Sequence, residues 1–480
     1  MKCILWFAAA CMAMVCTAAL TAAERPNVLF LFSDDQRADT IAALGNTHLQ
    51  TPNLDRLVRD GTTFTQAYCM GSNQGAVCVP SRAMLMSGRT LYRVQEQLKG
   101  QATWPESFAS AGYRTFMTGK WHNGAPSALR AFQEAKAVFL GGMGDPDAIP
   151  VQDMSSAGQG GNRQFVNRRT VEKHCVELFA DKAVEFVRAQ KQSSQPWLCY
   201  VAFNAPHDPR KAPPAWHEQT NANKPPIPEN FLPVHPFNNG EMTVRDEKLA
   251  PWPRTEPVIR QELADYYAAI MFMDSQIGRI LESLRATGQD EKTIIVFSSD
   301  HGLAIGSHGL MGKQSLYDHS MHSPLILAGP GVPKGEKRAA LCYLLDVYPT
   351  LGDLAGVNAP EGSEGLSLVP VLKGEEITRR QAIMTGYRKV QRAVRDDQWK
   401  LIVYPQVNKM QLYDLKSDPA ETRDLAREPG HAEEIDRMRT LLEKLQKENG
   451  DTQVLRSEHP GPLEFDFGSQ EAATKKGQDF

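Results

Sequence analysis

Several short stretches of the chain are apolar at nearly every position and end in polar residues. They are residues 27–33, 197–203, 293–299 and 324–328. A strand that is apolar on consecutive positions is typical of a sheet covered on both faces, because both sides of the strand are then buried. These stretches therefore predict the central strands of a buried, mostly parallel sheet.

Helical spacing of apolar residues is found between these stretches. The candidate helices are residues 53–60, 104–111, 171–189 and 262–285. In the last of them Leu263, Tyr266 and Ile270 begin a series at helical spacing, so one face would pack against the sheet. Strands alternating with helices predict an α/β core with a large mixed, mostly parallel sheet flanked by helices.

Two parts of the chain depart from this alternation. Residues 208–257 are rich in proline, asparagine and charge, and we interpret them as a long loop over one end of the sheet. Such a loop either shapes a binding site or is a passive excursion. After about residue 372 the pattern changes to short antiparallel strands at 382–385, 392–394 and 400–403 and a charged amphipathic helix at 432–448. We predict a large domain over residues 24–372 and a smaller C-terminal α+β subdomain over 373–480.

The first residues of the chain have the pattern of a secretory signal peptide. Lys2 precedes the apolar residues 4–20, and small residues follow up to Ala23. We predict a signal peptide over residues 1–23 that is cleaved near Ala23, which places the protein in the periplasm or outside the cell. A membrane anchor is the alternative, but the apolar stretch is short for one, and we expect no stable membrane insertion.

The composition narrows the function further. Apolar residues make up 41% of the 480 residues and charged residues 23%, which is typical of globular proteins. The net charge of −3 gives no overall basic field, and we expect no nucleic-acid partner. Cleavage at Ala23 would leave an odd number of cysteines, so at least one thiol is unpaired or chemically different. The remaining cysteines are Cys69, Cys78, Cys175, Cys199 and Cys342.

Polar residues follow the ends of separate predicted strands. Asp34 and Asp35 follow the first, His207 the second, and Asp300 and His301 the third. Functional groups in open α/β sheets collect beyond the carboxyl ends of strands. Carboxylates that converge there need a cation, and their oxygens suit Ca²⁺ or Mg²⁺. Capping of the following helix is the alternative reading of the adjacent aspartates.

The segment from Cys78 to Arg89 predicts a nucleophile at a helix N-terminus. Pro80 fits the first turn of a helix, which places Cys78 at its start. The free backbone amides there attract an anion, and Arg82 lies one turn further on. A buried structural thiol is the alternative.

The same segment resembles the signature of a known enzyme family. Cys78-Val79-Pro80-Ser81-Arg82, followed by Ser87-Gly88-Arg89, is similar to the motif of type I sulfatases of the alkaline-phosphatase-like superfamily. Other segments resemble the same family, namely 25–29 through Asp35, Gly119-Lys120-Trp121-His122, Asp300-His301-Gly302, Gly312-Lys313 and 412–415.

The resemblance implies a modified residue and a metal ion. Cys78 would be oxidised by a formylglycine-generating maturation enzyme to Cα-formylglycine, whose hydrate attacks the sulfur of a sulfate ester. Asp34, Asp35, Asp300 and His301, together with the modified Cys78, would ligate Ca²⁺. Mg²⁺ is also possible, because the family often has asparagine where His301 stands.

The resemblance also implies catalytic roles for several cationic groups. Arg82 and Lys120 would bind oxygens of the hydrate or the sulfate. His122 would take the proton that triggers sulfate release. His207 and Lys313 would contact the ester and help the alcohol leave.

Further arginines and histidines are candidates for substrate binding. They are Arg37, Arg93, Arg210, His308 and His322. For the arginines the alternative is a solvated surface side chain.

These features predict a sulfatase that removes O-sulfate groups from sulfated carbohydrates. The resemblance to the family implies that it is exo-acting. The alternatives are an arylsulfatase-like enzyme or a phosphate or phosphonate monoester hydrolase on the same scaffold. A further alternative is a protein that binds sulfated glycans but does not hydrolyse them.

Overall fold

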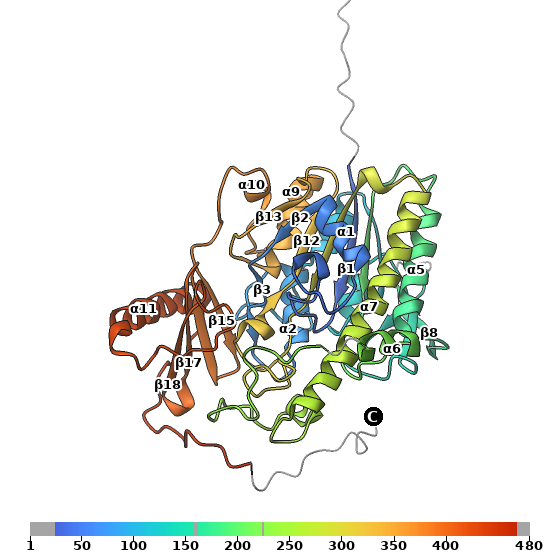
Figure 1. The fold of residues 1–480 in the computed structure, drawn as a ribbon. Coiled ribbons are helices and arrows are strands. Elements are labelled where there is room, and N and C mark those ends of the chain that lie inside the picture. Colours follow the sequence, from blue (N-terminus) through green and yellow to red (C-terminus); the bar gives the residue numbers. More distant parts are fainter. Residues whose placement is uncertain (1–24, 157–161, 223–224, 468–480) are drawn as a thin grey trace, which may run out of the picture.

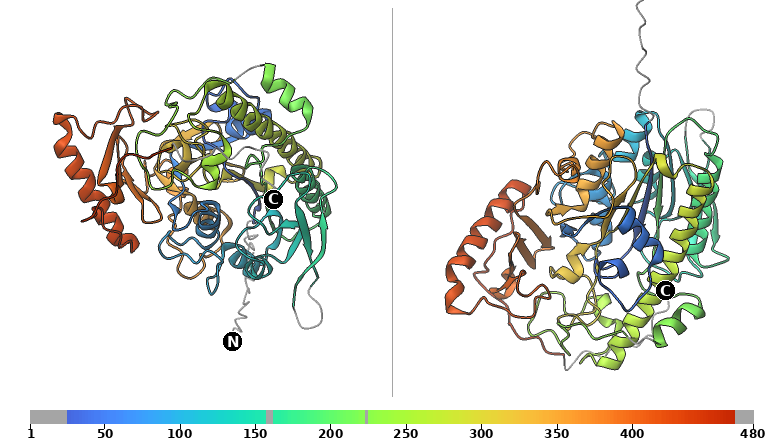
Figure 2. Two further views of the ribbon diagram at one scale, coloured as in Figure 1. Left: turned by 90° about the horizontal axis from the view of Figure 1, so that it is seen from below. Right: turned by 45° about the horizontal axis from the view of Figure 1, so that its top comes forward.

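A ten-stranded sheet forms the centre of the large domain (Figures 1 and 2). The computed structural model describes residues 25–156, 162–222 and 225–467. The strands, in spatial order, are β13 (Glu336–Arg338), β2 (Gly61–Phe64), β12 (Leu325–Ala328), β10 (Thr293–Ser299), β1 (Asn27–Ser33), β9 (Trp197–Ala202), β5 (Arg114–Lys120), β6 (Glu134–Phe139), β7 (Pro150–Met154) and β8 (Phe165–Thr170). The central strands from β10 to β6 are parallel, whereas β12, β7 and β8 make antiparallel pairs. The prediction of a mixed, mostly parallel sheet is confirmed.

Helices cover both faces of this sheet. The helices of the large domain are α1 (Pro52–Asp60), α2 (Cys78–Ser87), α3 (Trp104–Ser110), α4 (Ala125–Ala131), α5 (Cys175–Ala189), α6 (Pro214–Ala222), α7 (Glu256–Ala286), α8 (Asp318–Met321), α9 (Val347–Ala355) and α10 (Val369–Leu372). Alternate residues of β1 enter opposite cores: Phe30 packs with the residues of α3 and α9, and Leu31 with those of α5 and α7. This double burial explains why the sequence of β1 is apolar at consecutive positions.

The C-terminal subdomain is a second, smaller sheet with a helix on it (Figure 1). Strands β15 (Ile383–Tyr387), β16 (Gln391–Arg395), β17 (Trp399–Tyr404) and β18 (Lys409–Asp414) pair antiparallel, and α11 (Ala432–Asn449) packs against them. The short strand β4 (Gly71–Ser72) comes from the large domain and extends this sheet beside β15. A small sheet of β11 (His322–Ser323), β3 (Ala67–Tyr68) and β14 (Cys342–Tyr343) lies in the large domain. The expected α+β subdomain is confirmed, and its boundary at residue 372 stays a prediction.

The interpretation of residues 208–257 as a loop without regular structure is wrong in two places. Helix α6 lies inside this segment, and a 3₁₀ helix spans Arg245–Leu249. Helix α7 begins at Glu256, before the predicted start at residue 262. A proline in the first turn does not interrupt a helix, because the N–H that it lacks has no partner there.

The predicted signal peptide lies outside the described residues. Within the described ranges, no helix is both long and apolar enough to cross a bilayer. The cysteines within the described ranges are all buried, and none of them forms a disulfide. They are Cys69, Cys78, Cys175, Cys199 and Cys342.

Candidate active site

The ends of β1 and β10 bring the predicted acidic residues together. The two strands pair in register up to Ser33 and Ser299, so the residues that follow them are neighbours. The backbone N–H of Asp35 donates a hydrogen bond of 3.0 Å to Asp300 Oδ1. Asp35 adopts a φ of 66°, in the left-handed region that non-glycine residues take infrequently.

Cys78 is the first residue of α2 and faces this acidic edge. Its Sγ lies 3.3 Å from His301 Nε2 and 3.3 Å from Lys313 Nζ. Asp35 Oδ1 is 3.9 Å from the same sulfur. The Ser81 hydroxyl, one turn further along α2, donates a hydrogen bond of 2.7 Å to the Asp300 carbonyl and fixes the helix start above the strand end.

Cationic side chains pair with each of the carboxylates. Arg82 Nε donates to Asp300 Oδ2 at 3.1 Å. Lys313 Nζ donates to the two oxygens of Asp35 at 2.9 and 3.0 Å. Lys120, the last residue of β5, contacts Asp34. These three cations are at most 4% exposed.

The two predicted catalytic histidines flank the cluster from other elements. His122 follows β5 with a φ of 67°, and its ring interacts with the Cys78 side chain. Burial lowers the pKa of His122, which favours a neutral ring that can accept a proton. His207 follows β9, and its Nε2 lies 3.8 Å from Asp35 Oδ2. Burial alone would lower the pKa of His207, but the Asp35 and Asp208 carboxylates together raise it to about 9.

The electrostatics of the cluster favour an ionised nucleophile. Burial would raise the pKa of the Cys78 thiol, but Lys313 and Lys120 hold the pKa well below its usual value. Burial and the neighbouring Asp34 carboxylate raise the pKa of Asp300 to about 7. The carboxylates are so close that one of them resists ionisation, and a further positive charge would relieve this crowding.

The donor set fits a divalent cation. Ligand atoms of Asp34, Asp35 and Asp300 lie within 4.8 Å of one another, and so do those of Cys78, Asp300 and His301. Asp34 Oδ1 is buried and has no hydrogen-bond partner. Arg82 Nη2 lies 3.5 Å from this oxygen. A buried carboxylate oxygen that accepts no hydrogen bond, among other carboxylate oxygens, is a suitable ligand for Ca²⁺ or Mg²⁺. All the residues predicted as metal ligands are therefore brought together.

A pocket of about 290 Å³ opens onto Cys78. The predicted residues that line it are Cys78, His122, His207 and Lys313. Sequence reasoning missed others on its wall, namely Met143, Arg245, Asp246 and Gln314. Of these, Arg245 and Asp246 lie in residues 208–257, whose sequence has no periodicity. The only signal for them was the interpretation of this segment as a loop that shapes a binding site.

The predicted substrate-binding residues do not line this pocket. The three arginines pair with acids: Arg37 with Asp39, Arg93 with Glu364 and Arg210 with Glu262. The histidine rings stack on tyrosines: His308 on Tyr317 and His322 on Tyr68. Their positions give the substrate role no support, and it stays a prediction.

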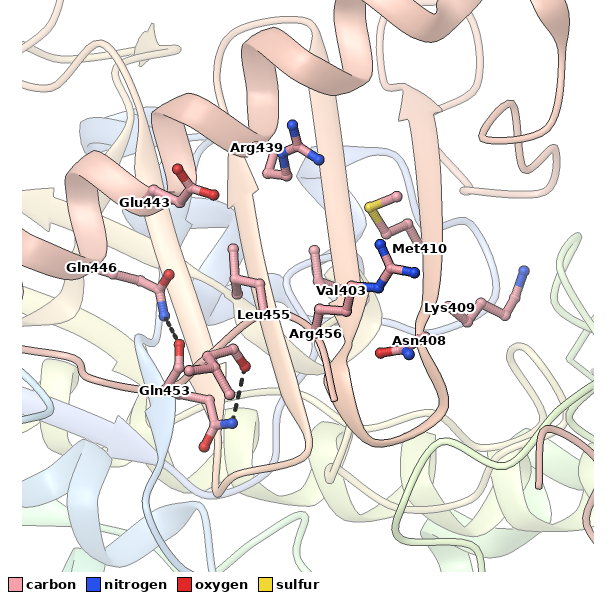
Figure 3. A pocket seen from close by; sticks show the side chains of 11 residues that line it. Val403, Asn408, Lys409, Met410, Arg439, Glu443, Gln446, Gln453, Leu455 and Arg456 are labelled. Carbon is pink, nitrogen blue, oxygen red and sulfur yellow. Dashed lines mark hydrogen bonds between the residues drawn. The ribbon is translucent and has the colours of Figure 1, made fainter. Parts of the chain in front are cut away.

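A larger pocket, of about 540 Å³, lies under α11 in the C-terminal subdomain (Figure 3). Its polar groups are largely used within the protein. Gln446 Nε2 donates to Asp451 and to the Gln453 carbonyl, and Asn408 Nδ2 donates to the Ser457 carbonyl. Neither a nucleophile nor a metal-ligand cluster of the described residues lies there, so we place the active site at Cys78.

Family models match most of the chain. The sulfatase model matches residues 26–357, which is more than half of the chain. A second model, described as N-sulphoglucosamine sulphohydrolase, C-terminal, matches residues 306–448.

Individual proteins are similar over nearly the whole chain. A protein of Formosa agariphila named sulfatase is 30% identical over 455 residues, which cover 88% of this chain and 87% of that protein. The N-acetylglucosamine-6-O-sulfatase of Bacteroides thetaiotaomicron is 26% identical, with 89% of this chain and 87% of that protein covered. One solved structure, described as a complex with its substrate D-glucosamine-2-N,6-O-disulfate, has a TM-score of 0.75 at 24% identity. It covers 90% of this chain and 100% of that one, and at this identity the likeness shows the fold alone.

Proposed function

Because the chain belongs to the sulfatase family and is a sulfuric ester hydrolase, we propose that it removes O-sulfate groups from sulfated carbohydrates, acting on chain ends. Two of the similar proteins support a sugar substrate, since one is named an N-acetylglucosamine-6-O-sulfatase and the other is described with a disulfated glucosamine. The pocket of about 290 Å³ is at the lower end of small-molecule sites, which favours a terminal unit over an internal chain segment.

The position of Cys78 is the observation that carries this proposal. Its side chain is at the pocket, in contact with Lys313 and His301 and beside the carboxylates. As Cα-formylglycine, residue 78 would supply a hydrate hydroxyl as the nucleophile toward sulfur. Because Cys78 is only 2% exposed, a maturation enzyme would have to reach it before the chain folds.

The carboxylates and His301 would hold the metal ion. Asp34, Asp35, Asp300, His301 and the modified residue 78 are the proposed ligands, with Ca²⁺ as the expected ion and Mg²⁺ as the alternative. The ion would supply Lewis acidity to the nucleophile and to a sulfate oxygen.

The cations and histidines would bind the sulfate and move protons. Arg82, Lys120 and Lys313 form ion pairs with the carboxylates, and cationic groups stabilise negative charge that spreads over sulfate oxygens. Neutral His122 would accept the proton whose loss triggers sulfate release. His207 would donate a proton from Nε2 to the departing alcohol oxygen.

Export remains part of the proposal. A signal peptide over residues 1–23 would direct the protein to the periplasm or the medium, where sulfated polysaccharide fragments are accessible.

The experiment is a screen of defined sulfated mono- and disaccharides, with released sulfate measured by ion chromatography. We expect release from a subset of them by protein that was coexpressed with a maturation enzyme and supplied with Ca²⁺. Peptide mass spectrometry over residue 78 measures the conversion of the cysteine in the same preparation. Absence of release from every substrate, despite full conversion, would overturn the sugar assignment.

Matched phosphate esters decide between sulfatase and phosphatase action. The same alcohols esterified with phosphate should be turned over far more slowly than the sulfates. A preference for phosphate would favour a phosphate or phosphonate monoester hydrolase instead.

A further inference from the structure

The segment that follows His207 forms an outer layer of charged groups behind the catalytic histidine. Asp208 is 7% exposed, and its carbonyl oxygen lies 2.8 Å from His207 Nδ1. Its carboxylate Oδ1 lies 3.4 Å from the same nitrogen. Both oxygens only accept hydrogen bonds, so Nδ1 carries a proton and the other ring nitrogen, Nε2, faces the active site.

Arg245 binds the carboxylate that faces His207. Its Nη1 donates to Asp208 Oδ1 at 3.1 Å and its Nη2 to Asp208 Oδ2, so the guanidinium holds both oxygens. Nη1 also donates to Asp246 Oδ1 at 2.6 Å. Arg245 is on the wall of the Cys78 pocket, and its side chain is 36% exposed.

The 3₁₀ helix that carries Arg245 is fixed to the other wall of the pocket. The buried Glu247 carboxylate accepts hydrogen bonds from the backbone N–H groups of Met311, at 3.0 Å, and Gly312, at 2.9 Å. These residues directly precede Lys313. Arg245 is therefore held in place relative to Lys313 as well as to His207.

We propose that Asp208 and Arg245 are positioning residues, which hold the His207 ring so that Nε2–H points at the departing oxygen of the substrate. This inference rests on the proposed sulfatase function. When the bond between sulfur and the ester oxygen breaks, its electron pair goes to that oxygen and the Nε2 proton is transferred to it. His207 is left neutral and regains a proton from water. A bidentate arginine fixes a carboxylate in one orientation, and the carboxylate then fixes the imidazole.

The test is the dependence of the rate on the acidity of the leaving group. 4-Nitrophenyl sulfate releases an acidic phenol that needs little protonation, whereas phenyl sulfate and N-acetylglucosamine 6-O-sulfate release weaker acids. We expect Asp208→Ala to lower kcat for the weakly acidic leaving groups by about 10²-fold and for 4-nitrophenyl sulfate by less than about 3-fold. Asp208→Asn, which keeps an acceptor oxygen, should restore part of the loss.

Arg245→Lys provides a second variant that leaves the fold intact, because the side chain is partly exposed. It keeps the charge but cannot hold both oxygens, so we expect a smaller loss, about 10-fold, with the same dependence on leaving group. The matched control is Arg388→Ala. This variant removes an ion pair with Glu241, which lies in the same segment 208–257 as Arg245, but Arg388 has no contact with His207. We expect this control variant to have the same kcat as the wild type for all three esters.

Equal losses on all three esters would show that the two residues only maintain structure and would overturn the proposal. Failure of the wild-type enzyme to release sulfate from any of these esters and from every sugar of the screen would instead overturn the proposed function, and this inference with it. The two failures are distinguishable because the first requires an active wild-type enzyme.

Discussion

Two clusters of buried charged side chains lie in this molecule, and they differ in what surrounds them. The first, the Cys78 cluster, consists of Cys78, Asp34, Asp35, Asp300, His301, Arg82, Lys120 and Lys313. The second, the interface cluster, consists of Tyr68, Asp318, Arg395, Lys400 and Glu421. Lys400 Nζ lies 2.7 Å from both Asp318 Oδ1 and Glu421 Oε1. Tyr68 and Asp318 belong to the large domain and the others to the C-terminal part, so the interface cluster joins the two.

The difference lies in access and in how like charges are arranged. The cavity beside the interface cluster measures about 10 Å³, which holds one water at most, whereas the Cys78 pocket measures about 290 Å³. In the Cys78 cluster, three carboxylates present oxygens within 4.8 Å of one another and a thiol lies beside them. Burial of charge is thus shared by both clusters, and convergence of donor atoms on an open pocket is the feature that distinguishes the active site.

Removal of the proposed nucleophile should distinguish the Cys78 cluster from the interface cluster most clearly. We expect Cys78→Ala to lower kcat by about 10⁴-fold or more, because the attacking group is lost, with little change in the free energy of unfolding. Sulfate release by ion chromatography and urea denaturation measure the two effects. Cys199→Ala is the control, since that thiol is buried in β9 away from the pocket and its loss should leave turnover unchanged. Full activity of Cys78→Ala would exclude residue 78 as the nucleophile.

Removal of the metal ion should have the next largest effect. A chelator should lower kcat/KM by about 10³-fold, because several kcal/mol of charge stabilisation are lost. Ca²⁺ at about 100 times its dissociation constant should raise the free energy of unfolding by about 2.7 kcal/mol in the wild type. Asp300→Asn should remove this stabilisation, measured by urea denaturation with and without Ca²⁺.

The interface cluster supplies the control for the metal. Asp318→Asn changes a half-buried carboxylate that also pairs with cations, but no group of the described residues that could hold an ion includes it. Its response to Ca²⁺ should equal that of the wild type. An equal loss of response in both variants would mean that Ca²⁺ acts on the fold in general.

Removal of a cation from the interface cluster should cost stability and leave turnover intact. Lys400→Met leaves Asp318 and Glu421 without their shared cation, and we expect a loss of about 3–5 kcal/mol in the free energy of unfolding. The activity per folded molecule should be unchanged. Lys416→Met, which removes an exposed ion pair with Asp397, should leave the free energy of unfolding nearly unchanged. A fall in kcat without a fall in stability would assign the interface cluster to catalysis.

The convergence of the proposed metal ligands could be predicted because it follows from strand order. Asp34 and Asp300 each follow a strand that is apolar on both faces, and parallel strands of that kind end at one edge of the sheet. The helix start at Cys78 could be predicted from Pro80, whose ring fits a first turn. Both arguments use only local sequence and one general rule of topology.

The outer wall of the pocket could not be predicted in this way. Arg245 reaches Asp208 across a segment without periodicity, and only the folded chain shows the pairing. The same limit applies to the arginines that were predicted to bind substrate. Arg37 is held by Asp39 and by the Ala304 carbonyl, and no spacing rule shows that these partners already use its guanidinium. Strand β18 was missed because Lys409 and Gln411 interrupt its apolar residues.

The smallest expected effect concerns His308, which was predicted to bind substrate but lies near the interface cluster. Its ring stacks on Tyr317 with centroids 3.8 Å apart, and its Nε2–H donates to the Glu421 carbonyl at 2.9 Å. Burial lowers the pKa of His308 to about 4 from an ordinary value of 6.5. Between these two values the unfolded chain binds a proton that the folded chain does not, so this group removes stability as the pH falls through that range.

Replacement of His308 by glutamine keeps a hydrogen-bond donor and removes this titration. The free energy of unfolding of the wild type should fall between pH 6.5 and pH 5 by about 2 kcal/mol more than that of His308→Gln, at about 1.4 kcal/mol per pH unit. Urea denaturation at several pH values measures the slopes. KM for sulfate esters should be the same in both proteins, because His308 does not line the Cys78 pocket. A higher KM for His308→Gln, with the same pH dependence of the free energy of unfolding as the wild type, would instead support His308 as a substrate-binding residue. The separation of catalytic from structural charged groups would then fail at His308.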